Sequence, residues 1–284
     1  MAAPSLPDHD GPTRAPGVSP LTLFARARAA VYTAALTSTT SPWYASVLSR
    51  LPRGSTLLDV GIGTASALLA HAPLLRERQL RVVGVDYDEA YVAAAAAAVA
   101  QAGMTDVIAV VHASIYDYDP STAVVAAAPE HLAAPTVGER GRLAHGGPPP
   151  LGITVYDAAY FSGSFMILPD QGRALAKVAA LLRRPPVADG DSSGGSGGGG
   201  GGRLYWTQTF EGDHRAAGGG GWVEWLKPRL ASLTSVDFGQ VTYADEFRAV
   251  LAAGGVEIEE EVVLSGTPGR RCAKLVVGRP GGGG

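Results

Sequence analysis

The chain has 284 residues, 46% of them hydrophobic, and carries a formal net charge of −3. A negative charge argues against a nucleic-acid partner, which would need a basic surface, and no apolar run reaches the roughly 18 residues that cross a bilayer. The only cysteine, Cys272, excludes an intramolecular disulfide and a cysteine-based metal site, and the scattered histidines suggest no metal. We therefore expect a soluble protein of a reducing compartment, the cytoplasm, with no membrane partner.

The first part of the chain predicts a leader followed by two helices. Residues 1–20 are rich in Pro, Ala and Asp without apolar periodicity, which indicates a disordered leader with no secretory signal. Residues 21–36 have apolar residues at helical spacing. Pro42, Trp43 and Tyr44 open a short second helix that ends near Leu51.

The segment over residues 57–65 is an apolar strand that leads into closely spaced glycines and a helix start. Gly61 and Gly63 allow positive backbone φ angles and let a ligand approach the main chain. Asp59 narrows the choice of ligand, because a carboxylate at the end of this strand would repel the pyrophosphate of a dinucleotide. It would favour S-adenosylmethionine, which has an ammonium group, a sulfonium and no phosphate.

Two further strands follow. Residues 81–86 form an apolar run that ends in Asp86, about 25 residues after the glycines, where a carboxylate can accept both hydroxyls of a ribose. Tyr87 could lie against an adenine ring. Residues 107–117 predict the third strand, and Ser114 and Ile115 stand where it leaves the sheet. Both are also ordinary residues for the end of a strand.

The second half alternates strands with low-complexity segments. Residues 156–162 and 204–210 predict the fourth and fifth strands, with a helical pattern over 170–182 between them. Residues 256–264 and 272–277 read as a terminal hairpin joined by a turn sequence with Gly and Pro. We expect the segments at about 120–151 and 184–202, and the glycine tail over 281–284, to be flexible.

On these motifs, from Leu57 onward, the sequence resembles the class I S-adenosylmethionine-dependent methyltransferases over roughly residues 55–278. The resemblance implies an α/β fold: a doubly wound, mostly parallel seven-stranded sheet with a terminal antiparallel hairpin and helices on both faces. From the length and composition we expect one domain over residues 21–280. Family members often use N-terminal helices as a lid over the cofactor, whereas Trp43 and Tyr44 could equally pack on the sheet.

The resemblance also assigns sites. It implies that S-adenosylmethionine is bound by Asp59, Gly61, Gly63, Asp86, Tyr87, Ser114, Ile115 and Phe161. Tyr160, Ser162 and Trp206 are candidates to contact the substrate, at the ends of the fourth and fifth strands, although core packing is an equal alternative for the aromatic ones.

The acceptor is expected to be a small molecule. The stretch Phe161-Ser162-Gly163-Ser164 lacks the Asn/Asp-Pro-Pro-Tyr/Phe pattern of nucleobase and glutamine methylation, and Cys272 lies far from it. No catalytic residue is identified, because in-line methyl transfer depends mainly on alignment and on exclusion of water.

Two other function classes remain open. A nicotinamide-dependent oxidoreductase would share the strand, glycine loop and helix, but Asp59 and Ser66 disfavour it. A binding or scaffold protein with a degenerate methyltransferase fold would account for Ala65 in place of the third glycine and for Ser114 in place of an acid. Cofactor binding discriminates among the three.

Overall fold

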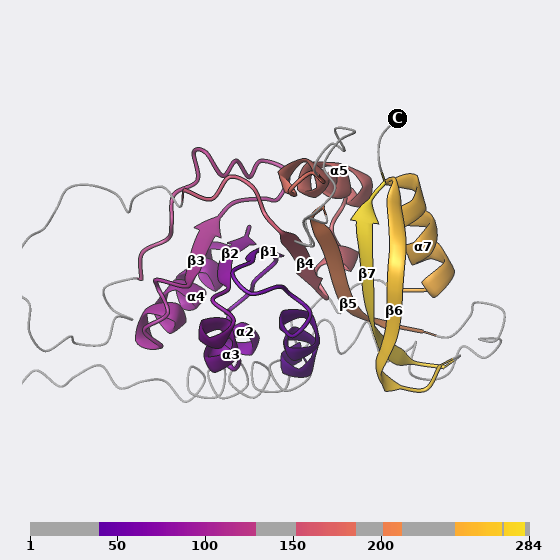
Figure 1. Cartoon of the computed structure of the whole chain (residues 1–284), viewed down its shortest axis with the longest axis horizontal. Coiled ribbons are helices and arrows are strands. Elements are labelled where there is room, and N and C mark those ends of the chain that lie inside the picture. The colour runs from indigo at the N-terminus through magenta and orange to yellow at the C-terminus, as the bar shows by residue number, and fades with distance from the viewer. Residues whose placement is uncertain (1–39, 129–151, 186–200, 212–241, 269, 282–284) are drawn as a thin grey trace, which may run out of the picture.

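The computed structural model describes residues 40–128, 152–185, 201–211, 242–268 and 270–281. They build one seven-stranded sheet in the order β3-β2-β1-β4-β5-β7-β6, which runs from left to right in Figure 1. The strands are β1 (Thr56–Val60), β2 (Arg81–Asp86), β3 (Ile108–His112), β4 (Ala158–Ser162), β5 (Arg203–Phe210), β6 (Val256–Gly266) and β7 (Cys272–Pro280). The helices are α2 (Ser66–Leu69), α3 (Ala72–Glu77), α4 (Glu89–Gln101), α5 (Gln171–Leu181) and α7 (Ala244–Ala253), with a 3₁₀ turn η1 (Phe165–Ile167).

The sheet confirms the predicted fold class. Strands β1 to β5 pair in parallel, and β7 pairs antiparallel with both β5 and β6. The chain moves outward from β1 through β2 to β3 and then returns to place β4 on the other side of β1. This reversal of strand order makes the carboxyl ends of β1 and β4 the expected place for a ligand in an open α/β sheet.

Helices cover both faces of the sheet, because successive side chains of a strand point to opposite sides. On one face, Leu57 of β1 packs in a core with α2, α3, α4 and a further helix over residues 40–48, here called the Tyr44 helix. On the other, Leu58 packs in a core with α5 and α7. Since β1 is buried on both faces, its sequence is a nearly continuous apolar run. The predicted helix that begins around Pro42 is confirmed.

Helix starts follow from local chemistry. The Asp88 carboxylate accepts hydrogen bonds from the backbone amides of Ala90 and Tyr91 and so caps α4. Asp170 caps α5 in the same way through the amide of Arg173. Both caps fix where the chain leaves the carboxyl side of the sheet and turns into a covering helix.

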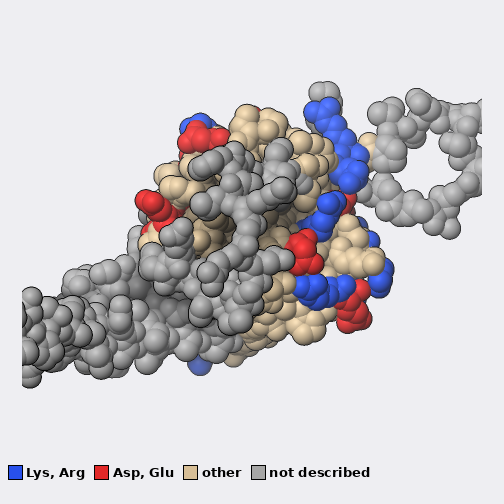
Figure 2. Space-filling model, turned by 90° about the vertical axis from the view of Figure 1, so that its left-hand side faces the viewer, with Lys and Arg blue, Asp and Glu red and all other residues tan. Residues whose placement is uncertain are grey.

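The edge strand β6 carries a row of acidic residues that are paired with basic ones. Glu257 lies 2.7 Å from Arg279, Glu259 lies 2.9 Å from Arg203, and Glu261 is bonded to Arg248. Charges on an edge strand discourage pairing with another chain. Figure 2 shows another part of the surface, on which acidic and basic side chains also lie near one another.

The start of the segment predicted to be flexible over 120–151 is held against the opposite sheet edge. The Ala126 amide donates to the Val110 carbonyl at 2.7 Å, and Val125 forms an antiparallel bridge with Val111 of β3. The expectation of a loose segment is therefore wrong for residues 125 and 126, because β3 offers them unpaired backbone groups. The leader, the predicted helix over 21–36, and residues 129–151, 186–200 and 282–284 lie outside the described residues. Among those described, no helix is long and apolar enough to span a membrane.

Candidate cofactor site

The loop after β1 is a tight turn held against β2. The Gly61 amide donates to the Val85 carbonyl at 2.8 Å. Gly61 and Gly63 have φ angles of 81° and 58°, which explains their residue type. A Cβ on Gly61 would lie 2.6 Å from the Cβ of Ser164. Ala65 also has a left-handed φ of 58°, so this position has the conformation that a third glycine would adopt at lower cost.

Asp86 brings the end of β2 to this loop. Its Oδ2 accepts the backbone amide of Gly63 at 2.9 Å, and its Oδ1 accepts the amide of Asp88 at 3.1 Å. A carboxylate has about four lone-pair directions, so each oxygen keeps acceptor capacity for a hydroxyl of a ligand. The structure thus joins Gly63 and Asp86, two residues that were predicted separately.

Asp59 is a fully buried acid whose hydrogen bonds are incomplete. The Tyr44 hydroxyl donates to Oδ2 at 2.7 Å, while Oδ1 has no partner among the described residues. Burial raises the pKa of Asp59 from 3.8 to about 7; the Tyr44 hydrogen bond lowers it and the charge of Asp86 raises it further. A cation that bound at Oδ1 would satisfy this oxygen and stabilise the ionised carboxylate.

Further polar groups lie on the same face of the sheet. The Tyr160 hydroxyl is 2.6 Å from Thr207 Oγ1, and the rings of Tyr44 and Tyr160 meet edge to face at 5.0 Å. Ser162 is near enough to both tyrosyl hydroxyls to lower the pKa of each, yet its buried Oγ makes no well-formed hydrogen bond. Four elements, the Tyr44 helix, β1, β4 and β5, therefore converge on one buried polar cluster.

The residues predicted to bind an adenine lie in three different environments. Tyr87 is 71% exposed at the end of β2, where its carbonyl accepts a hydrogen bond from His112. Ser114 is half-buried and its hydroxyl accepts the amide of Tyr116 at 3.4 Å. Ile115 is buried in the core under α5 and α7. Their contacts with an adenine stay a prediction.

Phe161 and Trp206 are part of the core on the α5 and α7 face. Their rings stack with an interplanar angle of 4° and both are fully buried. Phe165 and Phe247 meet the Trp206 ring at steep angles. In this arrangement neither ring is open to a ligand. A contact of Phe161 with the cofactor and of Trp206 with the substrate stays a prediction.

Sequence reasoning named Tyr44 only as a packing or lid residue and missed Thr207. Tyr44 lies 15 residues before Asp59, and no local pattern connects the two. Thr207 is the strand partner of Ser162, so the register of β4 and β5 would have revealed it.

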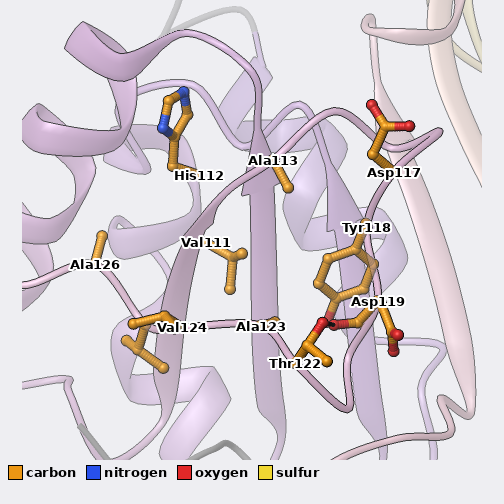
Figure 3. Close-up of a pocket in the computed structure, with 11 residues that line it drawn as sticks. Val111, His112, Ala113, Asp117, Tyr118, Asp119, Thr122, Ala123, Val124 and Ala126 are labelled. Atoms are coloured by element: carbon orange, nitrogen blue, oxygen red, sulfur yellow. Dashed lines mark hydrogen bonds between the residues drawn. The ribbon is translucent and has the colours of Figure 1, made fainter. Parts of the chain in front are cut away.

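The pocket shown in Figure 3 lies apart from the candidate cofactor site. It has a volume of about 430 Å³ and lies between the end of β3 and residues 117–126. His112, Tyr118 and Val124 are among its lining residues. It contains none of the residues predicted to hold a ligand, so the glycine loop with Asp59 and Asp86 remains the candidate site. Within the described ranges, no cluster of His, Cys, Asp and Glu could hold a metal ion.

No protein-family model matches the sequence, and no curated protein matches it either. Solved structures do match in fold. The S-adenosylmethionine-dependent methyltransferase SibL aligns with a TM-score of 0.55 and 18% identity over 93% of this chain and 60% of its own. The geranyl diphosphate C-methyltransferase from Streptomyces coelicolor A3(2) aligns with a TM-score of 0.52 and 12% identity, over 86% of this chain and 79% of its own. The [4+2]-cyclase SpnF aligns with a TM-score of 0.55 and 15% identity, over 86% of this chain and 82% of its own. At such identities the likeness shows the fold.

Proposed function

We propose that this chain, whose fold is that of the class I methyltransferases, binds S-adenosylmethionine and transfers its methyl group to a small molecule. The observation that carries the proposal is the meeting of the glycine loop and two acids at the carboxyl ends of β1 and β2. Gly63 donates to Asp86 at 2.9 Å, and one oxygen of the buried Asp59 has no partner within the described ranges.

The residues present fit this cofactor. Gly61 and Gly63 keep the backbone of the loop free of side chains, and Asp86 has acceptor capacity for two vicinal hydroxyls. The unpartnered oxygen of Asp59 suits an ammonium group, because a charge pair offsets the cost of burying the carboxylate. Tyr87, Ser114 and Ile115, at the ends of β2 and β3, are the proposed neighbours of the adenine.

When bound, S-adenosylmethionine supplies an electrophilic methyl group on a sulfonium. The work of the protein is then to align an acceptor with that methyl and to exclude water. Ser162 at the end of β4 and Tyr160 before it are the proposed neighbours of the acceptor. A small-molecule acceptor is supported by the structural neighbour named for its action on geranyl diphosphate.

Other functions have weaker support. A dinucleotide-binding oxidoreductase is disfavoured by the negative charge of Asp59 at the loop and by β7, which is inserted antiparallel between β5 and β6. The second candidate is a reaction other than methyl transfer, since one protein of this fold is named as a [4+2]-cyclase and a fold does not determine a reaction.

Calorimetric titration with S-adenosylmethionine, S-adenosylhomocysteine and NAD tests the proposal. We expect both sulfur ligands to bind and the Asp86→Ala variant to lose that binding. The matched control is Asp106→Ala, which removes an exposed carboxylate paired with Arg76. Release of S-adenosylhomocysteine with a panel of small acceptors then separates methyl transfer from binding alone. Binding of NAD with no response to either sulfur ligand would refute the proposal.

A further inference from the structure

The Tyr44 helix contacts the candidate site through one side chain. Tyr44 is 3% exposed, and its hydroxyl donates to Asp59 Oδ2 at 2.7 Å. Burial and the charge of Asp59 raise the pKa of Tyr44 well above its ordinary value, so this hydroxyl keeps its proton and acts as a donor. Among the described residues it is the one side chain that donates a hydrogen bond to this carboxylate.

In the part of the chain that the structure describes, no positive charge compensates Asp59. The titratable groups that face it are Tyr44 from the helix, Tyr160 from β4 and Asp86 from β2. Tyr160 donates no proton to it, and Asp86 is itself acidic. Among the described residues, no cation acts on the pKa of Asp59. The Tyr44 hydrogen bond is thus the contact that favours the ionised form of Asp59 before a ligand arrives.

The helix that carries Tyr44 is docked on the sheet by other contacts. At its start, His71 Nε2 lies 2.7 Å from the Ser41 carbonyl. Val47 and Leu48 are fully buried in the core of this face. At its end, Arg50 pairs with Glu260 of β6 at 3.0 Å. Loss of the Tyr44 hydroxyl would therefore alter Asp59 without undocking the helix.

We propose that Tyr44 is a positioning residue for the positive charge of the cofactor: its hydroxyl holds Asp59 through Oδ2 and leaves Oδ1 to receive the ammonium group. This inference rests on the proposed binding of S-adenosylmethionine. By linkage, cofactor binding and the hydrogen bond from Tyr44 to Asp59 stabilise each other, because both favour the ionised carboxylate. A bound cofactor therefore adds to the docking of the Tyr44 helix that the other contacts provide.

The inference predicts a pH dependence that a purely structural role would not produce. A cationic group binds to the carboxylate form of Asp59, so affinity falls as the pH drops through the pKa of that group. Removal of the Tyr44 hydroxyl takes away the hydrogen bond that lowers this pKa. The fall in affinity then begins at a higher pH in the Tyr44→Phe variant.

The test compares the wild-type protein, Tyr44→Phe and Tyr156→Phe by titration with two ligands between about pH 6 and 8. Tyr156 is the matched control, because it is also fully buried and its hydroxyl pairs with Tyr118, in the core of the other face. S-adenosylhomocysteine has the ammonium group, and 5′-methylthioadenosine lacks it. Hydrogen exchange over residues 40–48 reports docking of the helix.

We expect Tyr44→Phe to bind S-adenosylhomocysteine about tenfold more weakly than the wild type, with its pH profile moved upward. We expect 5′-methylthioadenosine to bind both proteins equally, and S-adenosylhomocysteine to increase protection of residues 40–48 more in the wild type. Equal weakening for both ligands, or an unmoved pH profile, overturns the inference and leaves the proposed function standing. If the wild type binds neither ligand, the proposed function fails and the inference fails with it.

Discussion

Replacing Asp59 with Asn should stabilise the ligand-free protein at pH 8 and weaken its binding of the cofactor. Burial raises the pKa of Asp59 from 3.8 to about 7. Each pKa unit corresponds to about 1.4 kcal/mol, so ionised Asp59 costs about 4 kcal/mol of folding free energy at pH 8. The pKa of Asp59 is higher in the folded protein than in the unfolded chain. Its contribution to stability is therefore complete below pH 3.8, the unfolded pKa, and is lost as the pH rises through about 7, the folded pKa.

The Asn variant retains part of this cost. Its amide oxygen can still accept the Tyr44 hydroxyl, while its amide nitrogen takes the place of the oxygen that has no partner. A buried donor without a partner costs about 1–3 kcal/mol. The net gain at pH 8 should therefore be about 2 kcal/mol.

The assay is urea unfolding of both proteins at pH 5 and pH 8 without ligand. From pH 5 to pH 8, the free energy of unfolding should fall more for the wild type than for Asp59→Asn. Asp106→Asn serves as control, because its carboxylate is exposed. If the Asn variant keeps the wild-type pH dependence, the reasoning about Asp59 is wrong. If it binds S-adenosylhomocysteine as tightly as the wild type, Asp59 does not hold the ammonium group.

Two further substitutions test the surroundings of the site. Gly61→Ala should cost about 2–4 kcal/mol, through its positive φ and the contact with Ser164. Gly54 has a similar φ of 79°, but an added Cβ would meet open space there. Gly54→Ala should therefore cost about 1–2 kcal/mol less stability than Gly61→Ala, as measured by thermal unfolding. If the two variants unfold at the same temperature, an added methyl group does not clash with Ser164 and the steric argument for Gly61 is wrong. Gln208→Met should be neutral or stabilise by about 1 kcal/mol, because both amide atoms of Gln208 are buried without partners. A loss of stability in urea would mean that the amide is bonded.

Local patterns in the sequence were sufficient for the order of the elements and for the main loop. The apolar run before Gly61, the acid that ends the second strand, and the paired terminal strands each depend on residues close together in the chain. Their conformations follow from backbone preferences and from burial on both faces of a parallel strand. This is why the single strands, the terminal hairpin and the positions of Asp59 and Asp86 were predictable. The seven-stranded sheet itself was what the resemblance to the class I methyltransferases implied.

The contacts between elements required the tertiary structure. A strand pattern cannot state which face of the sheet receives Phe161 and which receives Tyr160, because neighbouring residues alternate and both faces are apolar here. The hydrogen bond from Tyr44 to Asp59 joins a helix to a strand, and it exists only because the Tyr44 helix docks across β1 and β4. The sequence by itself thus identified candidates for ligand binding. Docking decided which of them are buried, which are paired, and that one oxygen of Asp59 has no partner in the described part of the chain.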